Sequence, residues 1–253
     1  MRLFHHPASK LAAGPTLLLP ADPGPALLDA ARRYDPGVRR SALLHRLIFS
    51  NGVLLLGPVP VTPRLAQEAG LPGGTAVAWY ALTALQGHRE RRAHDTKADD
   101  GERLVRGLAA RLGGTTHPAA LQPQLALIAS VYSEQAPDPE QVTETLRPYG
   151  GDLRVEDEKA GGYSLTGQKI HFSVAYWPPR RYRESDAPPA LGPLRSRPLH
   201  HWDLHGGARA ADAPRELCLR VGEGALALAS QSGGIVLDML GFPVSSPDDL
   251  LPR

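Results

Sequence analysis

Three stretches of this sequence end in the same way: GERLVRGLAARLGG at residues 101–114, PEQVTETLRPYGG at residues 139–151 and GALALASQSGG at residues 224–234. Each has the apolar spacing of a helix of about three turns and closes on a Gly-Gly pair. Each also follows an apolar run that is able to form a strand. Glycine adopts the left-handed conformation at little cost, so each pair is expected to end a helix and direct the chain into another strand. The sequence therefore predicts three strand-helix-strand units.

Two of these units follow each other directly. The strand of the first is expected over residues 75–85, although its alanine and leucine content is also compatible with a helix. The strand of the second is expected over residues 125–132, and Asp138 and Pro139 then suit the N-cap and the first position of a helix. Strand, helix, strand twice in succession is the order of the ferredoxin-like split β-α-β sandwich. We therefore expect residues 74–177 to form such a module, an antiparallel sheet with helices on one face.

The first 73 residues show a further version of the pattern. Residues 15–19 are expected to form a short strand, and Pro25 suits the first position of a helix that ends at Tyr34. Asn51-Gly52 separates two apolar runs, HRLIFS and VLLLG. This dipeptide between two β-rich runs predicts a hairpin with a type I′ turn.

A long segment rich in proline precedes the last unit. Residues 178–214 contain seven prolines in thirty-seven residues and no periodic apolar face, so we expect an extended excursion outside the sheets. Residues 215–253 then add a strand over RELCLRV, a helix and another strand. Because one such unit cannot cover its own sheet, we expect it to pack with residues 1–73. The predicted architecture is α+β, with two ferredoxin-like modules, the second assembled from both ends of the chain.

The composition is that of a folded protein without a strong net charge. The chain has 253 residues, 42% of them hydrophobic, and a formal net charge of +2, which by itself points to neither nucleic acid nor membrane. Most of its basic residues are arginine, which indicates the codon bias of a GC-rich bacterial genome. A single cysteine, Cys218, excludes an internal disulfide. We see no signal-peptide pattern and no apolar stretch of about 18 residues, so we expect a cytoplasmic protein.

The common catalytic and cofactor-binding motifs are missing from the sequence. It has no Walker loop, no GxGxxG fingerprint after a strand, and no CxxC, HExxH or GxSxG motif. We therefore expect no cofactor and no bound metal.

Two short motifs combine histidine with a hydroxyl side chain, His94-x-Thr96 and His171-x-Ser173. A His-x-Ser/Thr motif in each of two related lobes resembles the site of the two-histidine phosphoesterases, where alternate strand residues face one cleft. The strand KIHFSVAYW resembles such a motif more closely than the surroundings of His94, which suggest a loop. The resemblance implies His94, Thr96, His171 and Ser173 as catalytic residues. The alternative is that Thr96 begins a helix and His171 is an ordinary strand residue.

The segment HHWDLH at residues 200–205 concentrates three histidines and an aspartate. On a helix, His201 and His205 would share one face and could ligate a metal. The prolines before the segment and the Gly-Gly pair after it argue against a long helix. We therefore interpret it as a loop that is packed by Trp202 and holds no metal.

A basic run, Arg180-Arg181-Tyr182-Arg183, mixes charge with an aromatic ring in a way that single-stranded nucleic acid can use. Acidic residues follow directly, so a solvated loop is the simpler interpretation. We name these four residues and Trp202 as the candidate binding residues of the excursion, with the indole as its buried anchor.

These observations favour a protein without catalytic activity that binds a protein or a small molecule through its sheet or its proline-rich excursion. Two alternatives stay open. One is a phosphoesterase of the two-histidine type that acts on an RNA or a cyclic phosphodiester, and the other is an RNA-binding module. Close approach of His94 and His171 across one cleft would distinguish the phosphoesterase from the other two classes.

Overall fold

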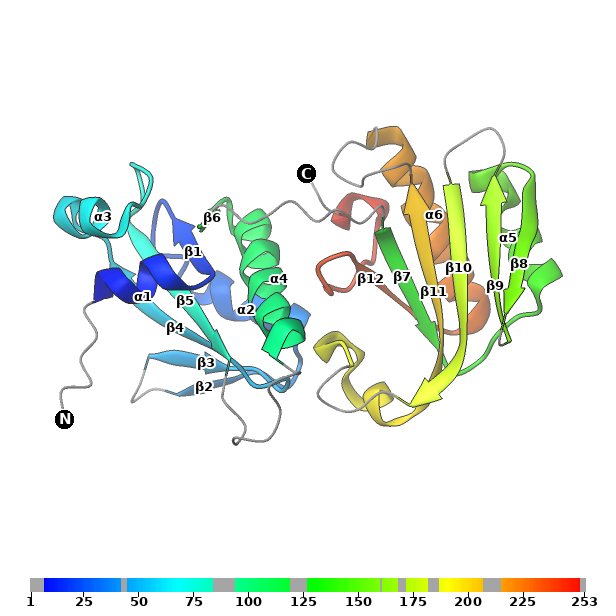
Figure 1. Cartoon of the computed structure of the whole chain (residues 1–253), viewed down its shortest axis with the longest axis horizontal. Coiled ribbons are helices and arrows are strands. Elements are labelled where there is room, and N and C mark those ends of the chain that lie inside the picture. Colours follow the sequence, from blue (N-terminus) through cyan, green and yellow to red (C-terminus); the bar gives the residue numbers. More distant parts are fainter. Residues whose placement is uncertain are drawn as a thin grey trace. The chain divides into compact units, whose positions relative to one another are not determined.

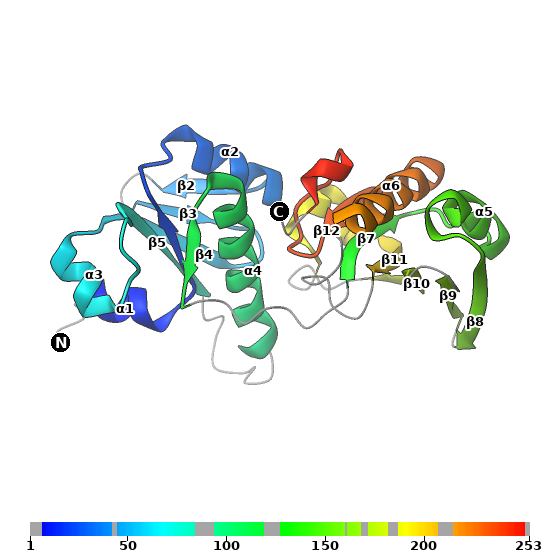
Figure 2. The ribbon, with the colours of Figure 1, turned by 90° about the horizontal axis from the view of Figure 1, so that it is seen from above.

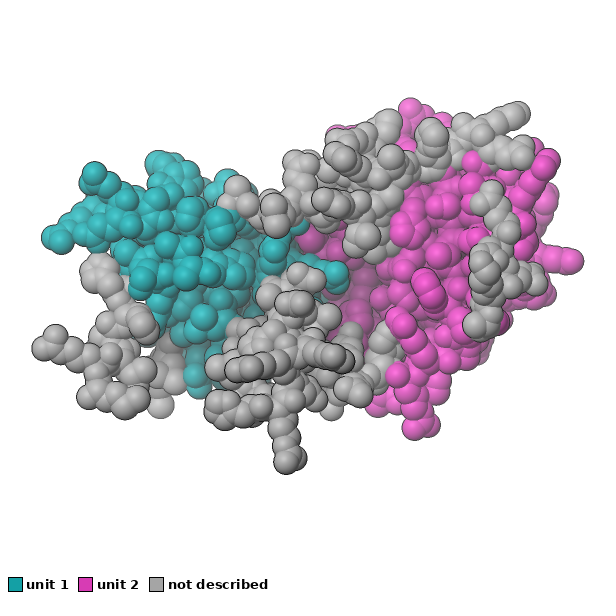
Figure 3. Space-filling model, in the orientation of Figure 1, with its two compact units in different colours: residues 1–121 teal, residues 122–253 magenta. Residues whose placement is uncertain are grey.

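The computed structural model of the chain contains two six-stranded antiparallel sheets with helices packed on them (Figure 1). The protein therefore belongs to the α+β class. It divides into two compact units, residues 1–121 and residues 122–253, which Figure 3 colours separately; we call them the first and the second unit. The structure describes residues 7–41, 45–83, 94–118, 127–159, 161–167, 172–181, 187–206 and 215–250.

The first unit has its strands in the spatial order β2-β3-β4-β5-β1-β6, each antiparallel to its neighbours. Its elements in chain order are α1 (Pro7–Ala13), β1 (Thr16–Leu19), α2 (Pro25–Tyr34), β2 (Arg39–Ser41), β3 (Arg46–Ile48), β4 (Val53–Pro60), α3 (Pro63–Ala69), β5 (Val77–Thr83), α4 (His94–Leu112) and β6 (Thr115–His117). The expected strands at residues 15–19 and 75–85 are thus present as β1 and β5.

Helices cover both faces of the first sheet. Leu18 of β1 packs in one cluster with Leu11 of α1, Ala69 of α3 and Ala78 of β5. Helix α4 contacts β1, β4, β5 and β6, and it also packs against α2. Figure 2 shows α1 and α3 on one side of this sheet and α4 on the other. This differs from the expected module with helices on one face, because α1 and α3 bury the apolar side chains of the second face as well.

The second unit has the spatial order β12-β7-β11-β10-β9-β8, again antiparallel throughout. Its elements are β7 (Leu127–Ser133), α5 (Pro139–Gly150), β8 (Leu153–Lys159), β9 (Gly162–Gly167), β10 (Phe172–Arg181), the 3₁₀ segment η1 (Pro189–Ser196), β11 (Pro198–Gly206), α6 (Arg215–Ser232), β12 (Ile235–Asp238) and the 3₁₀ turn η3 (Pro247–Asp249).

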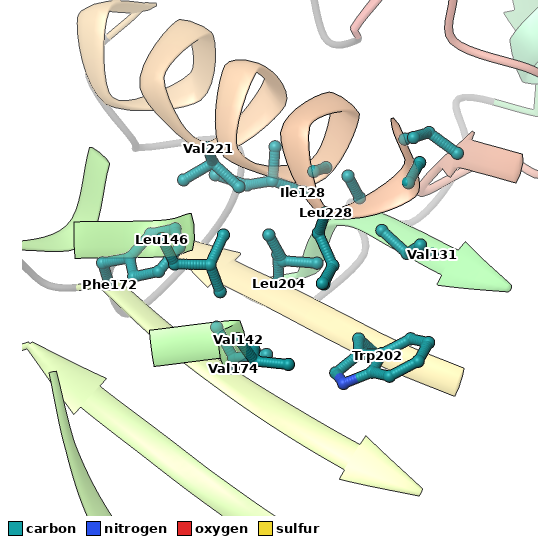
Figure 4. Packing of buried hydrophobic residues seen from close by; sticks show 14 of the residues in the cluster. Ile128, Val131, Val142, Leu146, Phe172, Val174, Trp202, Leu204, Val221 and Leu228 are labelled. Atoms are coloured by element: carbon teal, nitrogen blue, oxygen red, sulfur yellow. The ribbon is translucent and has the colours of Figure 1, made fainter. Parts of the chain in front are cut away.

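Helices α5 and α6 lie together on one face of the second sheet (Figure 2). Figure 4 shows Leu146 of α5 and Leu228 of α6 in the core that they form with Leu204 and Trp202 of β11. The two helices approach closely at Gly224, where a Cβ atom would lie 3.2 Å from Cδ2 of Leu146. Among the helices that the structure describes, none is both long and apolar enough to cross a bilayer.

The two units repeat one arrangement of elements. In each, a strand, a helix, three consecutive strands, a short helical segment, a strand, a helix and a strand follow in that order. The order β6-β1-β5-β4-β3-β2 of the first sheet matches β12-β7-β11-β10-β9-β8 of the second. A buried tryptophan stands at the same place in both, because Trp79 pairs with Leu17 and Trp202 pairs with Val131 in the two central strand pairs.

The boundaries of the units differ from those that the sequence suggested. Residues 1–73 share their sheet with β5 and β6, and residues 215–253 complete the sheet that β7 begins. The excursion expected over residues 178–214 is wrong in its central part, because β11 lies inside the second sheet between β7 and β10. The run RELCLRV is helical rather than a strand and forms the start of α6. Its apolar residues belong to a stripe in which Val221, Ala225 and Leu228 recur at helical spacing and are buried.

Local signals at the helix ends agree with the structure. Gly113, Gly151 and Gly233 have positive φ values of 65°, 72° and 65°, so each Gly-Gly pair contains one residue in a conformation that favours glycine. Asp138 caps α5 and forms a capping box with Gln141. The predicted stops and the predicted cap are therefore confirmed.

The hairpin at Asn51-Gly52 is also confirmed, because β3 and β4 pair in antiparallel register. Its turn is not of type I′, since Gly52 has a positive φ of 85° but Asn51 does not. Val53 O accepts from the amide of Phe49, and Phe49 O accepts from the amide of Gly52. This pattern corresponds to a three-residue loop with glycine at its last position.

Candidate functional site

Strand β11 carries ionisable side chains on one face and apolar side chains on the other. Because successive residues of a strand point to opposite faces, Trp202 and Leu204 lie beneath α5 and α6, where both are fully buried. His201, Asp203 and His205 lie on the opposite face. We call that face of the second sheet the polar face.

Asp203 is the centre of a compact cluster on the polar face. The hydroxyl of Ser130 on β7 donates a hydrogen bond of 2.6 Å to Oδ1 of Asp203, and Nε2 of His201 lies 2.7 Å from the same oxygen. Ser130 stands opposite Asp203 in the register of β7 and β11. Tyr132 stands opposite His201, and the two rings stack with centroids 4.3 Å apart. The pairing of β7 with β11 therefore positions both partners of the carboxylate.

The surroundings hold two pKa values of this cluster below their ordinary range. Burial would raise the pKa of Asp203, but the interaction with the His201 side chain, the hydrogen bond from Ser130 and the electrostatic attraction of His201 and His205 outweigh it and lower this pKa. Burial lowers the pKa of His205, against the attraction of Asp203, and the charge of His201 lowers it further. At neutral pH the polar face thus presents an ionised carboxylate beside a neutral imidazole.

Strand β10 extends the polar face. Opposite residues of an antiparallel pair point to the same side, with Cβ atoms about 5 Å apart. The pairs across β10 and β11 are Ser173 with His205, Ala175 with Asp203, and Trp177 with His201. Ser173 and Ala175 are half-buried, whereas the side chain of Trp177 is 47% exposed. A large aromatic ring therefore stands beside the ionisable cluster, and the small side chains of Ala175 and Ser173 lie between it and the start of β10.

The corresponding face of the first sheet is different in chemistry. In the matched arrangement, Ala78 occupies the position of His201, and Tyr80 occupies the position of Asp203. Ala78 pairs with Leu18 of β1 and Tyr80 with Thr16, just as His201 pairs with Tyr132 of β7 and Asp203 with Ser130. Ala78 and Tyr80 are buried in the apolar cluster that α1 and α3 cover. The same position is thus apolar and covered by α1 and α3 in the first unit. In the second unit it is ionisable. Part of this face is covered there too, because Ala190 and Leu191 of η1 pack in a buried cluster with Tyr132 and Leu199, and His201 is only 7% exposed.

A group of aromatic residues lies on the other face of the second sheet, the face that carries Trp202. Nε1 of Trp202 donates to the hydroxyl of Tyr163 at 3.2 Å, and the hydroxyl of Tyr176 lies 2.8 Å from Nδ1 of His200. Burial raises the pKa of Tyr163 to about 12 and also raises the pKa of Tyr176. Burial lowers the pKa of His200. These polar atoms bond to one another within the core, which is a structural role.

A surface groove of about 570 Å³ runs along α5 and the edge strand β8. Its lining includes Val155, which is 48% exposed, and the pair Glu144 and Arg147, whose charged atoms are 2.7 Å apart. The charges of this pair are neutralised within one turn of the helix and do not converge on a common point. The polar face is therefore the better candidate site.

The residues expected to be catalytic belong to both units. His94 and Thr96 lie in the first turn of α4, so their segment is helical rather than a loop. Ser173 lies on β10 and contributes to the polar face. His171 lies outside the described residues. The expected approach of His94 and His171 therefore stays a prediction.

The expected binding residues separate into two groups. Arg180 and Arg181 are exposed at the end of β10, whereas Trp202 is fully buried in the core of the second unit. Tyr182 and Arg183 lie outside the described residues. Trp202 does anchor its segment, but it anchors a central strand and not a loop on the surface.

The described part of the chain contains no group of three or more histidine, cysteine, aspartate or glutamate side chains placed to hold a metal ion. Comparison with other proteins adds no relative. No protein-family model, no curated protein and no solved structure matches the chain.

Sequence reasoning singled out the segment that forms the site but did not recognise its geometry. The alternation of His201, Asp203 and His205 with Trp202 and Leu204 has the period of two that marks a half-buried strand. The neighbouring prolines led us to predict a loop instead. Ser130 carries no signal of its own, since only the pairing of β7 with β11 brings it to the carboxylate.

Proposed function

We propose that the protein binds a polar ligand on the polar face of its second sheet, with His201, Asp203 and His205 as the central binding groups. The observation that carries this proposal is the difference between the two units. Where the first unit has the buried Ala78 and Tyr80, the second has a carboxylate and imidazoles, and Asp203 and His205 stay half-buried beside the part of the face that η1 covers. A half-buried ionised carboxylate is costly unless it makes strong interactions, so such groups mark binding sites more often than chance positions do.

The contacts of Asp203 support binding rather than nucleophilic catalysis. In a serine nucleophile site, the imidazole stands between the hydroxyl and the carboxylate and removes the hydroxyl proton. Here Ser130 and His201 both contact the same oxygen of Asp203. The hydroxyl proton is thus held by the carboxylate, and the cluster orients its donors and acceptors instead of activating a nucleophile.

We further propose that each unit is a ferredoxin-like module to which an outer strand pair has been added. The order β6-β1-β5-β4, with one helix after β1 and another after β5, supports this assignment in the first unit. The order β12-β7-β11-β10 supports it in the second. Helices on both faces of the first sheet are the departure from the simple module. The lone cysteine, Cys218, favours a reducing compartment, and we propose the cytoplasm.

A second candidate function is hydrolysis of a phosphodiester. It is favoured by Ser173, which faces the same side as His205 across the β10 and β11 pair. Release of product from cyclic nucleotides, lost in Ser173→Ala and in His94→Ala, would support it. An activity that survives both changes would exclude the two-histidine mechanism.

The binding proposal is tested with a panel of polar metabolites. Thermal unfolding is measured for the wild type, for the double variant Asp203→Asn with His205→Asn, and for the control Glu140→Gln, which changes an exposed carboxylate on α5. A ligand of the polar face should raise the unfolding temperature of the wild type and the control but not of the double variant. Equal stabilisation of all three proteins, or of none, would contradict the proposal.

A further inference from the structure

The polar face combines an exposed aromatic ring with a fixed set of hydrogen-bonding groups. Trp177 stands directly opposite His201 and diagonal to Asp203, a separation of about 7–8 Å between diagonal strand neighbours. Its indole is 47% exposed, whereas Trp79 and Trp202 are 8% and 0% exposed. The chain therefore leaves one of its three tryptophans accessible, and this one lies on the face that carries the ionisable cluster.

The strand registers place small side chains beside Trp177 on the polar face. Ala175 lies two residues before it on the same face, and Ser164 of β9 pairs with Ala175. These side chains are small and the indole is large, and we call this difference in side-chain size along β10 the step. Asp203 and His205 stand opposite Ala175 and Ser173 on the neighbouring strand.

The hydrogen-bonding capacity of the step is specific. Asp203 is ionised; its Oδ1 accepts a hydrogen bond from Ser130 and lies 2.7 Å from Nε2 of His201. A carboxylate has about four acceptor sites, so it can still accept from a ligand. The neutral ring of His205 offers one donor and one acceptor. Ser173 adds a hydroxyl that both donates and accepts.

We infer that the ligand of the polar face is a sugar, a polyhydroxylated ring that stacks on Trp177 and whose hydroxyl groups donate hydrogen bonds to Asp203. This inference rests on the proposed binding function. The face of an indole carries the negative side of its quadrupole, against which the C–H groups of a sugar ring pack. Hydroxyl groups bonded to an ionised carboxylate form charge-assisted hydrogen bonds, which are about twice as strong as neutral ones. The indole of Trp177 thus matches the C–H groups of such a ring, and the carboxylate of Asp203 matches its hydroxyl groups.

Single-stranded nucleic acid fits the same face less well. It also stacks on exposed aromatic rings, and Arg180 lies nearby at the end of β10. However, its phosphates would lie beside the ionised Asp203, and the net charge of +2 provides little compensating attraction. A neutral sugar avoids this repulsion.

Tryptophan fluorescence reports binding through Trp177, because the other two rings, Trp79 and Trp202, are buried. The full chain is titrated with glucose, galactose, mannose, ribose and maltose, and emission and quenching by acrylamide are recorded, with calorimetry as an independent measurement. At least one sugar should shift the emission to shorter wavelengths and protect it from acrylamide, because the exposed indole becomes covered. Trp177→Ala should abolish binding, and Asp203→Asn should weaken it about tenfold through the loss of charge-assisted bonds. Glu140→Gln is the matched control and should leave the affinity unchanged.

The outcomes separate this inference from the binding function on which it rests. Binding of a sugar that is lost in Trp177→Ala and kept in Glu140→Gln supports both. Absence of a shift and of heat with all five sugars overturns the inference. In that case the binding function is still supported if a metabolite of the thermal panel stabilises the wild type but not the double variant at Asp203 and His205. Salt-dependent binding of oligothymidylate to Trp177, without sugar binding, overturns the inference in favour of nucleic acid.

Discussion

Replacing Gly114 by alanine should destabilise the first unit more than replacing Gly113, although Gly113 is the glycine with the left-handed backbone. The two residues end α4 and begin the turn into β6. Gly113 has a φ of 65°, and a Cβ atom there would meet nothing within 4 Å. At Gly114 a Cβ atom would lie 2.5 Å from the carbonyl oxygen of Leu18 and 2.6 Å from Cδ2 of Leu19.

The two costs have different physical origins and magnitudes. Alanine at Gly113 pays for a left-handed conformation, about 1–2 kcal/mol, and asparagine there should cost less because it tolerates that region. Alanine at Gly114 forces β1 to move. Leu18 is paired with β5 on one side and with β6 on the other, so its carbonyl group cannot retreat without loss of pairing. Overpacking of this kind costs about 1–3 kcal/mol or more, and the backbone contact places this case at the upper end.

Urea unfolding followed by circular dichroism measures the two free energies, and hydrogen exchange of β1 and β6 localises the effect to the first unit. The second unit supplies a repeat of the experiment. Gly233 has a φ of 65° and open space, whereas a Cβ atom on Gly234 would lie 2.7 Å from the carbonyl oxygen of Tyr132. The reasoning is refuted if Gly114→Ala costs no more than Gly113→Ala, or if Gly113→Asn costs as much as Gly113→Ala.

Three further results are expected for the second unit. Acid should lower its free energy of unfolding from about pH 6.5 downward, because the lowered pKa of His205 lets the unfolded chain take up the proton first, and the lowered pKa of Asp203 continues the loss below about pH 4. His205→Asn should flatten the upper part of this profile in urea unfolding, and an unchanged profile would contradict the assignment. Tyr163→Phe removes the acceptor of Nε1 of the buried Trp202 and should cost about 1–3 kcal/mol; a loss below about 0.5 kcal/mol would speak against that bond. Burial raises the pKa of the Cys218 thiol, so a disulfide reagent at pH 8 should react with it more slowly than with glutathione, and an equal rate would count against its burial.

The helix ends and hairpins were predictable because their signals lie within a few residues of one another. The capping box of Asp138 and Gln141 and the left-handed Gly113 need only local backbone geometry. The prediction of a strand over RELCLRV was wrong because it also relied on a short local signal. A run of seven residues with both apolar and polar side chains fits the helical period and the strand period alike. Contacts beyond the run made the choice, for example where Gly222 packs closely on the side chain of Leu250.

The sequence by itself determined where helices stop, which runs are able to form strands, and that the chain is α+β. Only the tertiary structure decided which strands share a sheet. Strand β11 pairs with β7, so that Asp203 meets Ser130 from 73 residues away. Sheet pairing draws its free energy from such distant contacts, and a strand of mixed polarity acquires a buried and an exposed face only after helices have covered one side. For this reason His201, Asp203 and His205 could be noticed in the sequence, while their arrangement as a site had to wait for the fold.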